Sequence, residues 1–232
     1  MHVHDGFLDA PTSIATGAVA VAAVGVALRG ARRELDDKAA PMAGLVATFV
    51  FAAQMLNFPV GAGTSGHLLG GALAAVLVGP WTAMLCLSVV LLVQSLLFAD
   101  GGVTALGTNV VLMGVVGVLA GWLVFRALQA VLPKRQALVA PLAAVAAYLS
   151  VPITALAFVG LYAVGGTAPI PLDTLTTAML GWHLVIGLGE AAITGLVVAS
   201  IVTVRPDLVH GARRVLAERV VEIRTPVERT PA

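Results

Sequence analysis

The chain has 232 residues, of which 59% are hydrophobic and only 11% are charged. Its mean hydropathy is +1.00, whereas soluble domains carry about 25% charged residues. Too few polar side chains are present to cover a water-soluble globule, and the formal net charge of +1 gives no reason to expect a nucleic-acid partner. The composition therefore excludes an ordinary soluble domain and indicates a protein of the lipid bilayer.

Seven apolar segments follow one another along the chain, each rich in Leu, Val, Ala and Gly. A helix needs about 20 mainly apolar residues to cross a bilayer. The segments do not alternate between apolar and polar residues as the strands of a membrane barrel do. We therefore expect an all-α integral membrane protein with about seven transmembrane helices. The segments cover residues 12–29, 40–57, 67–79, 81–98, 103–125, 138–164 and 174–203.

The distribution of charge predicts the orientation of these helices. The segment 67–79 is short for a span, but if it crosses the membrane, all 13 Lys and Arg residues fall on one side, in the stretches 29–38, 126–135 and 205–229. The positive-inside rule then places the N-terminus outside and the C-terminus in the cytoplasm. Acidic residues precede the first apolar segment and basic residues follow it, which is not the pattern of a signal peptide, so we expect the N-terminus to be retained.

We expect one transmembrane domain over residues 1–204 and a polar, partly disordered cytoplasmic tail over residues 205–232. Small residues at helical spacing, such as Gly117 and Gly121, predict close helix packing in lipid. The single cysteine, Cys86, lies in an apolar run and is expected to be a small buried side chain.

Three histidines, His2, His4 and His67, fall on the predicted outer face, whereas His210 falls in the tail. A histidine at position two has special coordination chemistry, because the α-amine of Met1, the backbone nitrogen of His2 and its imidazole can close adjacent chelate rings around one metal. An imidazole from His67 would complete a square of nitrogens. Planar nitrogen ligands suit Ni(II) and Cu(II) and do not suit Mg(II) or Ca(II).

Two ionisable residues, His183 and Glu190, lie seven positions apart on one face of the last segment. Ionisable groups inside a span are functional candidates. The alternative is a structural polar contact to Gln54, Gln94 or Asn109 on other spans, and we favour that structural role.

Five stretches of the sequence make the chain resemble a known family. It is similar to the CbiM/NikM family, the substrate-binding components of energy-coupling-factor cobalt and nickel transporters. The resemblance extends over nearly the whole chain except the tail. The stretches are residues 1–8 (MHVHDGFL), 51–59 (FAAQMLNFP), 63–71 (GTSGHLLGG), 97–102 (LFADGG) and 187–191 (GLGEA).

The resemblance implies that Met1, His2 and His67 bind the metal through four nitrogens. His4 departs from the residue expected in many relatives, so it is an auxiliary ligand or has no role. The resemblance also implies a cargo of Co²⁺ or Ni²⁺, with cobalt slightly favoured, a link to cobalamin biosynthesis and the cell membrane of a prokaryote. The implied partners are a transmembrane coupling component, cytoplasmic ATPase subunits and a small auxiliary membrane subunit.

Two other functions compete with a transporter subunit that lacks an ATPase of its own. An intramembrane metal-dependent enzyme needs an open coordination position and a general base, but the sequence has no His-Glu-x-x-His motif. A metal sensor is the second alternative. The lysines Lys38 and Lys134 follow Asp37 and Pro133, so the chain contains no Gly-Lys pair of a P-loop.

Overall fold

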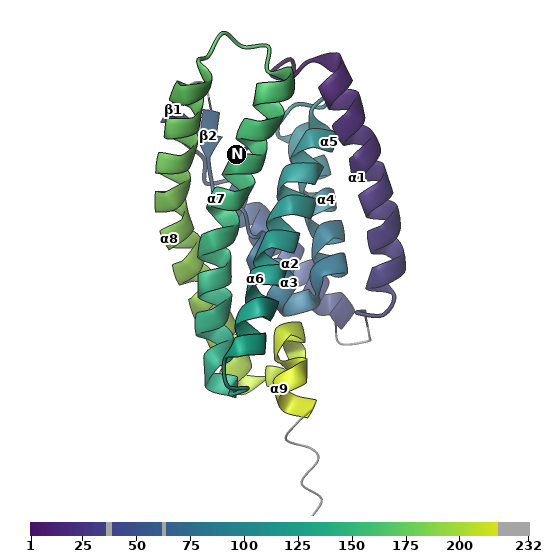
Figure 1. The fold of residues 1–232 in the computed structure, drawn as a ribbon. Helices are drawn as coiled ribbons and strands as arrows, with labels where there is room; N and C mark the ends of the chain where they lie inside the picture. The colour runs from purple at the N-terminus through teal and green to yellow at the C-terminus, as the bar shows by residue number, and fades with distance from the viewer. Residues whose placement is uncertain (36–38, 62–63, 218–232) are drawn as a thin grey trace, which may run out of the picture.

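The computed structural model describes residues 1–35, 39–61 and 64–217, and its long helices form a bundle with roughly parallel axes (Figure 1). One antiparallel pair of short strands, β1 (Phe58–Gly61) and β2 (Thr64–Gly66), interrupts the helices. The helices are α1 (Ala10–Ala31), α2 (Ala39–Gln54), α3 (Gly71–Val78), α4 (Pro80–Leu97), α5 (Leu106–Asn109), α6 (Val118–Val131), α7 (Val139–Gly165), α8 (Leu172–Val204) and α9 (Arg213–Ala217).

Within the described residues, five apolar helices are long enough to cross a membrane, and α2 is a shorter one of 16 residues. One of the five is continuous from α5 to α6 through a π-helical stretch, Val110–Gly117. Each of the seven predicted segments overlaps a helix of the structure, and the all-α membrane fold is confirmed. The number of spans and the orientation of the termini stay predictions.

The third predicted segment, 67–79, forms a helix only over its second part. The helix α3 has eight residues, all of them buried, and is therefore about 12 Å long. Residues 67–70 lie outside regular helix and lead from β2 to α3, and Figure 1 shows β2 in the upper half of the bundle and α3 in the lower half. Non-helical backbone advances farther per residue than a helix does, so this segment covers much of the bundle with few residues.

Small residues let α3 lie at the centre of the bundle. A Cβ at Gly121 would lie 2.5 Å from the Cβ of Ala72, and one at Gly71 would lie 3.0 Å from the backbone of Gly117. Close approach of this kind needs small residues, with glycine on at least one of the two helices. The predicted packing role of Gly117 and Gly121 is therefore confirmed, and Cys86 is buried as expected.

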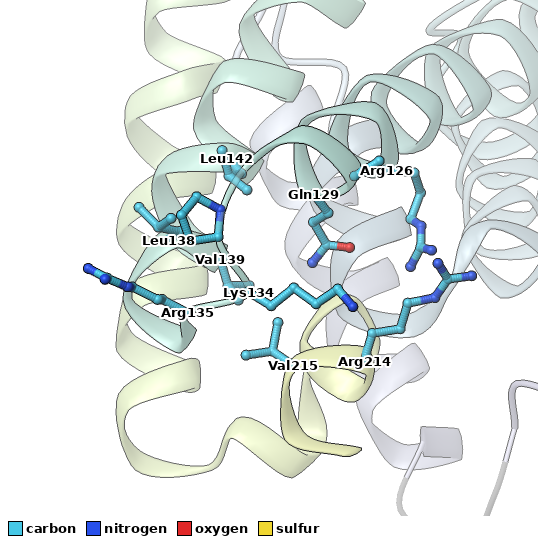
Figure 2. Close-up of a pocket in the computed structure, with 11 residues that line it drawn as sticks. Arg126, Gln129, Lys134, Arg135, Leu138, Val139, Leu142, Arg214 and Val215 are labelled. Carbon is cyan, nitrogen blue, oxygen red and sulfur yellow. The ribbon is translucent and has the colours of Figure 1, made fainter. Parts of the chain in front are cut away.

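Described basic residues gather at one end of the bundle. A cavity of about 180 Å³ there is lined by side chains from α6, α7 and α9 and from the turn between α6 and α7. In Figure 2, the ends of Arg126, Lys134 and Arg214 point toward one another, to the right of the apolar side chains of Leu138 and Val139. Basic residues of the stretches 126–135 and 205–229 thus meet at one end of the bundle, and the side of the membrane on which they lie stays a prediction.

The first part of the predicted tail is ordered against the bundle. After α8, the chain forms two short turns, Pro206–Leu208 and His210–Ala212, and then α9. Val209, Ala212 and Val215 are buried, and the backbone of Gly211 packs against Phe125. The boundary at residue 204 stays a prediction, and the expected disorder of the last residues lies outside the described part of the chain.

Candidate metal site

The N-terminal segment, residues 1–8, is buried at residues 1–3 and at Leu8, whereas residues 4–6 are exposed. Val3 exchanges two hydrogen bonds with the side chain of Asn109, at 2.8 and 3.0 Å, and its carbonyl also accepts one from the amide of Gly102 at 2.9 Å. Leu8 forms a β-bridge with Gly166, beyond the end of α7. These contacts fix both ends of the segment, and they bury Met1 and His2.

His2 and His67 come together although 65 positions separate them in the sequence. Their imidazole rings stack, with centroids 4.3 Å apart and an angle of 25° between the planes. Both side chains are buried, as is that of Met1. The structure therefore brings the two predicted histidines next to each other and places the N-terminal methionine in the same buried region.

The hydrogen bonds of His67 leave one ring nitrogen without a partner. Nδ1 of His67 lies 2.8 Å from the carbonyl oxygen of Leu68, and it must carry the proton in order to donate to that oxygen. The other nitrogen, Nε2, has no hydrogen-bond partner among the described residues. Metal-binding histidines commonly donate one ring N–H to a carbonyl and keep the other nitrogen for the metal.

His2 lies between an amide and a carboxylate. Its Nε2 lies 3.2 Å from Oε1 of Gln94, and its Nδ1 lies 3.0 Å from Oδ1 of Asp100. Asn57 donates a hydrogen bond to the other oxygen of Asp100 at 2.9 Å. Nδ1 is the nitrogen of His2 that can close a six-membered chelate ring with its own backbone nitrogen, so a negative charge lies beside a possible metal position.

Burial is the largest cause of the pKa shifts of the Met1 α-amine, His2 and His67. It lowers the pKa of the Met1 α-amine from 8.0 to about 4, although the charge of Asp100 opposes the shift. Burial also lowers the pKa of His2, against the hydrogen bond to Asp100, and it lowers the pKa of His67 well below its ordinary value. The α-amine and His67 are therefore neutral near pH 7, and a neutral nitrogen has a lone pair for a metal.

The turn that carries His67 is held from two sides. The carboxylate of Glu190 accepts hydrogen bonds from the backbone N–H groups of Leu69, at 2.8 Å, and Gly70, at 2.6 Å. Gln54 donates a hydrogen bond to the carbonyl of Leu69 at 2.7 Å. The expected structural partner of Glu190 was an amide side chain on another span, but the partner is this backbone turn.

Of the remaining histidines, His183 is close enough to interact electrostatically with His67 and with the Met1 α-amine, whereas His4 and His210 are not among the groups that act on His67. His4 is exposed, and His210 packs against Trp122 at the basic end of the bundle. His183 is buried and donates from Nδ1 to the carbonyl of Met179, while its Nε2 has no partner within the described ranges. The proposed contacts of His183 to amide side chains are not found, because Gln54, Gln94 and Asn109 bond elsewhere.

Side chains alone do not make a metal site here. In the part of the chain that the structure describes, no three His, Cys, Asp or Glu side chains are grouped as metal ligands would be.

The sequence did not reveal which polar residues support the histidines. Asp100, Gln94 and Asn109 hold the N-terminal segment, and Gln54 and Glu190 hold the turn after His67. The only signal was their position, because a polar residue inside or beside an apolar span must find a buried partner. The identity of that partner depends on the fold.

The family model described as the cobalt uptake substrate-specific transmembrane region, CbiM, matches residues 2–208. This chain belongs to the CbiM family. A fused nickel transport protein of Rhodobacter capsulatus is 36% identical over 226 residues, which are 92% of this chain and 65% of the fused protein. The cobalt transport protein CbiM of Geobacter sulfurreducens is 36% identical over 218 residues, which are 90% of this chain and 61% of that protein.

Other relatives of this CbiM family member match most of their own length. A Haloquadratum walsbyi protein, whose name assigns it to metal transport, is 39% identical over 90% of this chain and 93% of its own. A crystal structure of a transition metal transporter has a TM-score of 0.81 and 30% identity, and it covers 97% of this chain and 100% of its own. The protein is thus a membrane protein of a family of cobalt and nickel transport proteins.

Proposed function

We propose that this protein is the substrate-capture membrane subunit of an ATP-driven energy-coupling-factor importer for divalent cobalt or nickel. The observation that carries the proposal is the buried contact of His2 with His67 beside the neutral α-amine of Met1. The ligands proposed for the ion are the α-amine, the backbone nitrogen and Nδ1 of His2, and Nε2 of His67.

The charges around these nitrogens favour a divalent ion. A backbone nitrogen that binds a metal loses its proton and becomes negative, and Asp100 beside His2 contributes a second negative charge. Together they balance the two positive charges of the ion. A buried group of charges costs least when its net charge is zero, so this donor set fits a divalent cation of the later transition metals.

The direction of capture follows from the proposed orientation. Figure 1 shows the N-terminus in the upper half of the bundle, away from α9, which lines the basic cavity, and the positive-inside rule assigns the basic end to the cytoplasm. In a prokaryotic cell membrane, the ion would then enter from outside. A transmembrane coupling component, ATPase subunits and a small auxiliary membrane subunit would supply the transport step. His4, which is exposed, is not needed as a ligand.

Removal of His67 tests the proposed ligand set. We predict that His67→Ala lowers the affinity for Ni(II) and Co(II) by at least about 100-fold, because it removes one of four nitrogens and leaves three. His210→Ala, at the opposite end of the bundle, is the control and should leave the affinity unchanged. Isothermal titration of the purified full chain with each ion measures both. Equal affinities in the two variants would contradict the proposed site, and the ratio of the wild-type affinities would show which ion is preferred.

A further inference from the structure

Glu190 is a buried carboxylate that accepts hydrogen bonds from the turn that follows His67. Both of its oxygens accept a backbone N–H, one from Leu69 and one from Gly70. Within residues 1–35, 39–61 and 64–217, no ion-pair partner of Glu190 is found. Burying a carboxylate without a cation is costly, so two amides that point at it strongly favour this arrangement of the turn.

The geometry of the turn leaves it little freedom. Gly70 has a φ of +75°, in the left-handed region, and a Cβ at this position would lie 2.8 Å from a methyl group of Val50. The two amides that Glu190 binds precede the first turn of α3, where a helix favours negative charge. Gln54 binds the carbonyl of Leu69 from α2. The backbone between His67 and α3 is thus bound on its N–H side by α8 and on its C=O side by α2.

We propose that Glu190 is a positioning residue for His67, which holds the turn so that Nε2 of His67 faces the N-terminal nitrogens before any ion arrives. This inference rests on the proposed function. The carboxylate acts through the backbone of Leu69 and Gly70 and does not touch the ion. It lowers the cost of ordering His67 at the moment of binding, because a ligand already held in place loses less freedom.

A double-mutant cycle with His67 tests this role. The full chain with a free N-terminus is titrated with Ni(II) as wild type, Glu190→Gln, His67→Ala and the double variant. Glutamine has the shape of glutamate, but its NH₂ group cannot accept the second backbone N–H. We expect Glu190→Gln to lower the affinity by about 10- to 100-fold. In the His67→Ala background, the same change should alter the affinity by no more than about twofold.

Two further measurements separate positioning from simple stabilisation of the fold. The electron paramagnetic resonance spectrum of bound Cu(II) in Glu190→Gln should shift toward that of His67→Ala, because fewer ions then have the imidazole of His67 as a ligand. Thr194→Val, which removes a buried hydroxyl one turn farther along α8, is the control and should change neither affinity nor spectrum. If Glu190→Gln does not fold, Gln54→Leu removes the opposite contact of the turn and enters the same cycle.

The outcomes distinguish the two proposals. If His67→Ala lowers the affinity but Glu190→Gln does not, the positioning role is overturned and the proposed site stands. Equal losses from Glu190→Gln with and without His67 would show that Glu190 acts independently of His67, which also overturns the role. If His67→Ala itself has no effect, the proposed site and the positioning role both fall.

Discussion

The α-amine of Met1 is the group whose protonation the fold changes most clearly. In a solvated N-terminus its pKa is near 8.0, and burial lowers it to about 4. When residues 1–8 are unfolded or detached from the bundle (undocked), the α-amine therefore binds a proton below pH 8. When they are packed in the bundle (docked), it does not bind that proton. Docking is fully favoured above pH 8, and it weakens by about 1.4 kcal/mol for each pH unit between 8 and 4.

This shift makes a specific prediction for proton release. From solvated groups we would expect more than one proton per ion between pH 8 and 6, because free amines titrate at about 7.7–8.0 and histidines at about 6.5. In the docked segment burial lowers the pKa of the amine, of His2 and of His67, so the backbone N–H of His2 is the proton that remains to be displaced. We predict close to one proton per ion and an affinity that falls about tenfold per pH unit.

Titration calorimetry in buffers of different protonation enthalpy gives this proton count directly. A count near zero would favour carboxylate ligands such as Asp5, Asp9 and Asp100, which are already ionised in this range, and would contradict the backbone ligand. A count of two or more would mean that the N-terminal segment is solvated before the ion binds.

At the scale of elements, the central position of α3 depends on contacts between small residues, glycine and alanine. We predict that Gly121→Ala lowers the free energy of unfolding by about 1–3 kcal/mol, because the added methyl group would overlap Ala72 on α3. Gly160→Ala on α7 is the matched control: a Cβ there meets nothing within 4 Å, and alanine favours a helix. Unfolding in detergent, followed by circular dichroism, compares them. Equal stability of the two variants would contradict the account of this packing.

The sequence predicted the helices better than it predicted the segments between them. The lengths of the apolar runs located all seven segments, because a helix in lipid must be apolar over most of its length. It placed a helix start at 67, whereas α3 starts at Gly71, because the N–H and C=O groups of the turn are paired with Glu190 and Gln54 instead of with a helix. The π-helical stretch after Asn109 also had no local signal in the sequence.

The sequence suggested candidate ligands, but it did not suggest the residues that hold them in place. The chelating power of a histidine at position two is local chemistry, and the resemblance supplied His67. The partners Asp100, Gln94 and Glu190 lie 92 to 121 positions from the groups that they bind. Nothing in a single sequence pairs residues at such distances, because the pairing follows from how the helices pack.

At the scale of the whole molecule, the N-terminus is part of the proposed binding site. The segment 1–8 is enclosed by the loop after α4, by α5 and by the turn after α7. An ion that uses the α-amine of Met1 and the backbone nitrogen of His2 requires methionine to be the first residue and its amine to be free. An addition to the N-terminus would therefore remove ligands and also block the docking of the segment.

The most direct test compares Ni(II) and Co(II) binding by the purified chain with a free Met1 and by the same chain with an uncleaved N-terminal extension. Circular dichroism should show the same helix content in both forms. We predict that the extension lowers the affinity by more than about 100-fold, which exceeds the loss from an outer-shell contact, and that its proteolytic removal back to Met1 restores binding. An extended chain that binds either ion as tightly as the free form would contradict the nitrogen site.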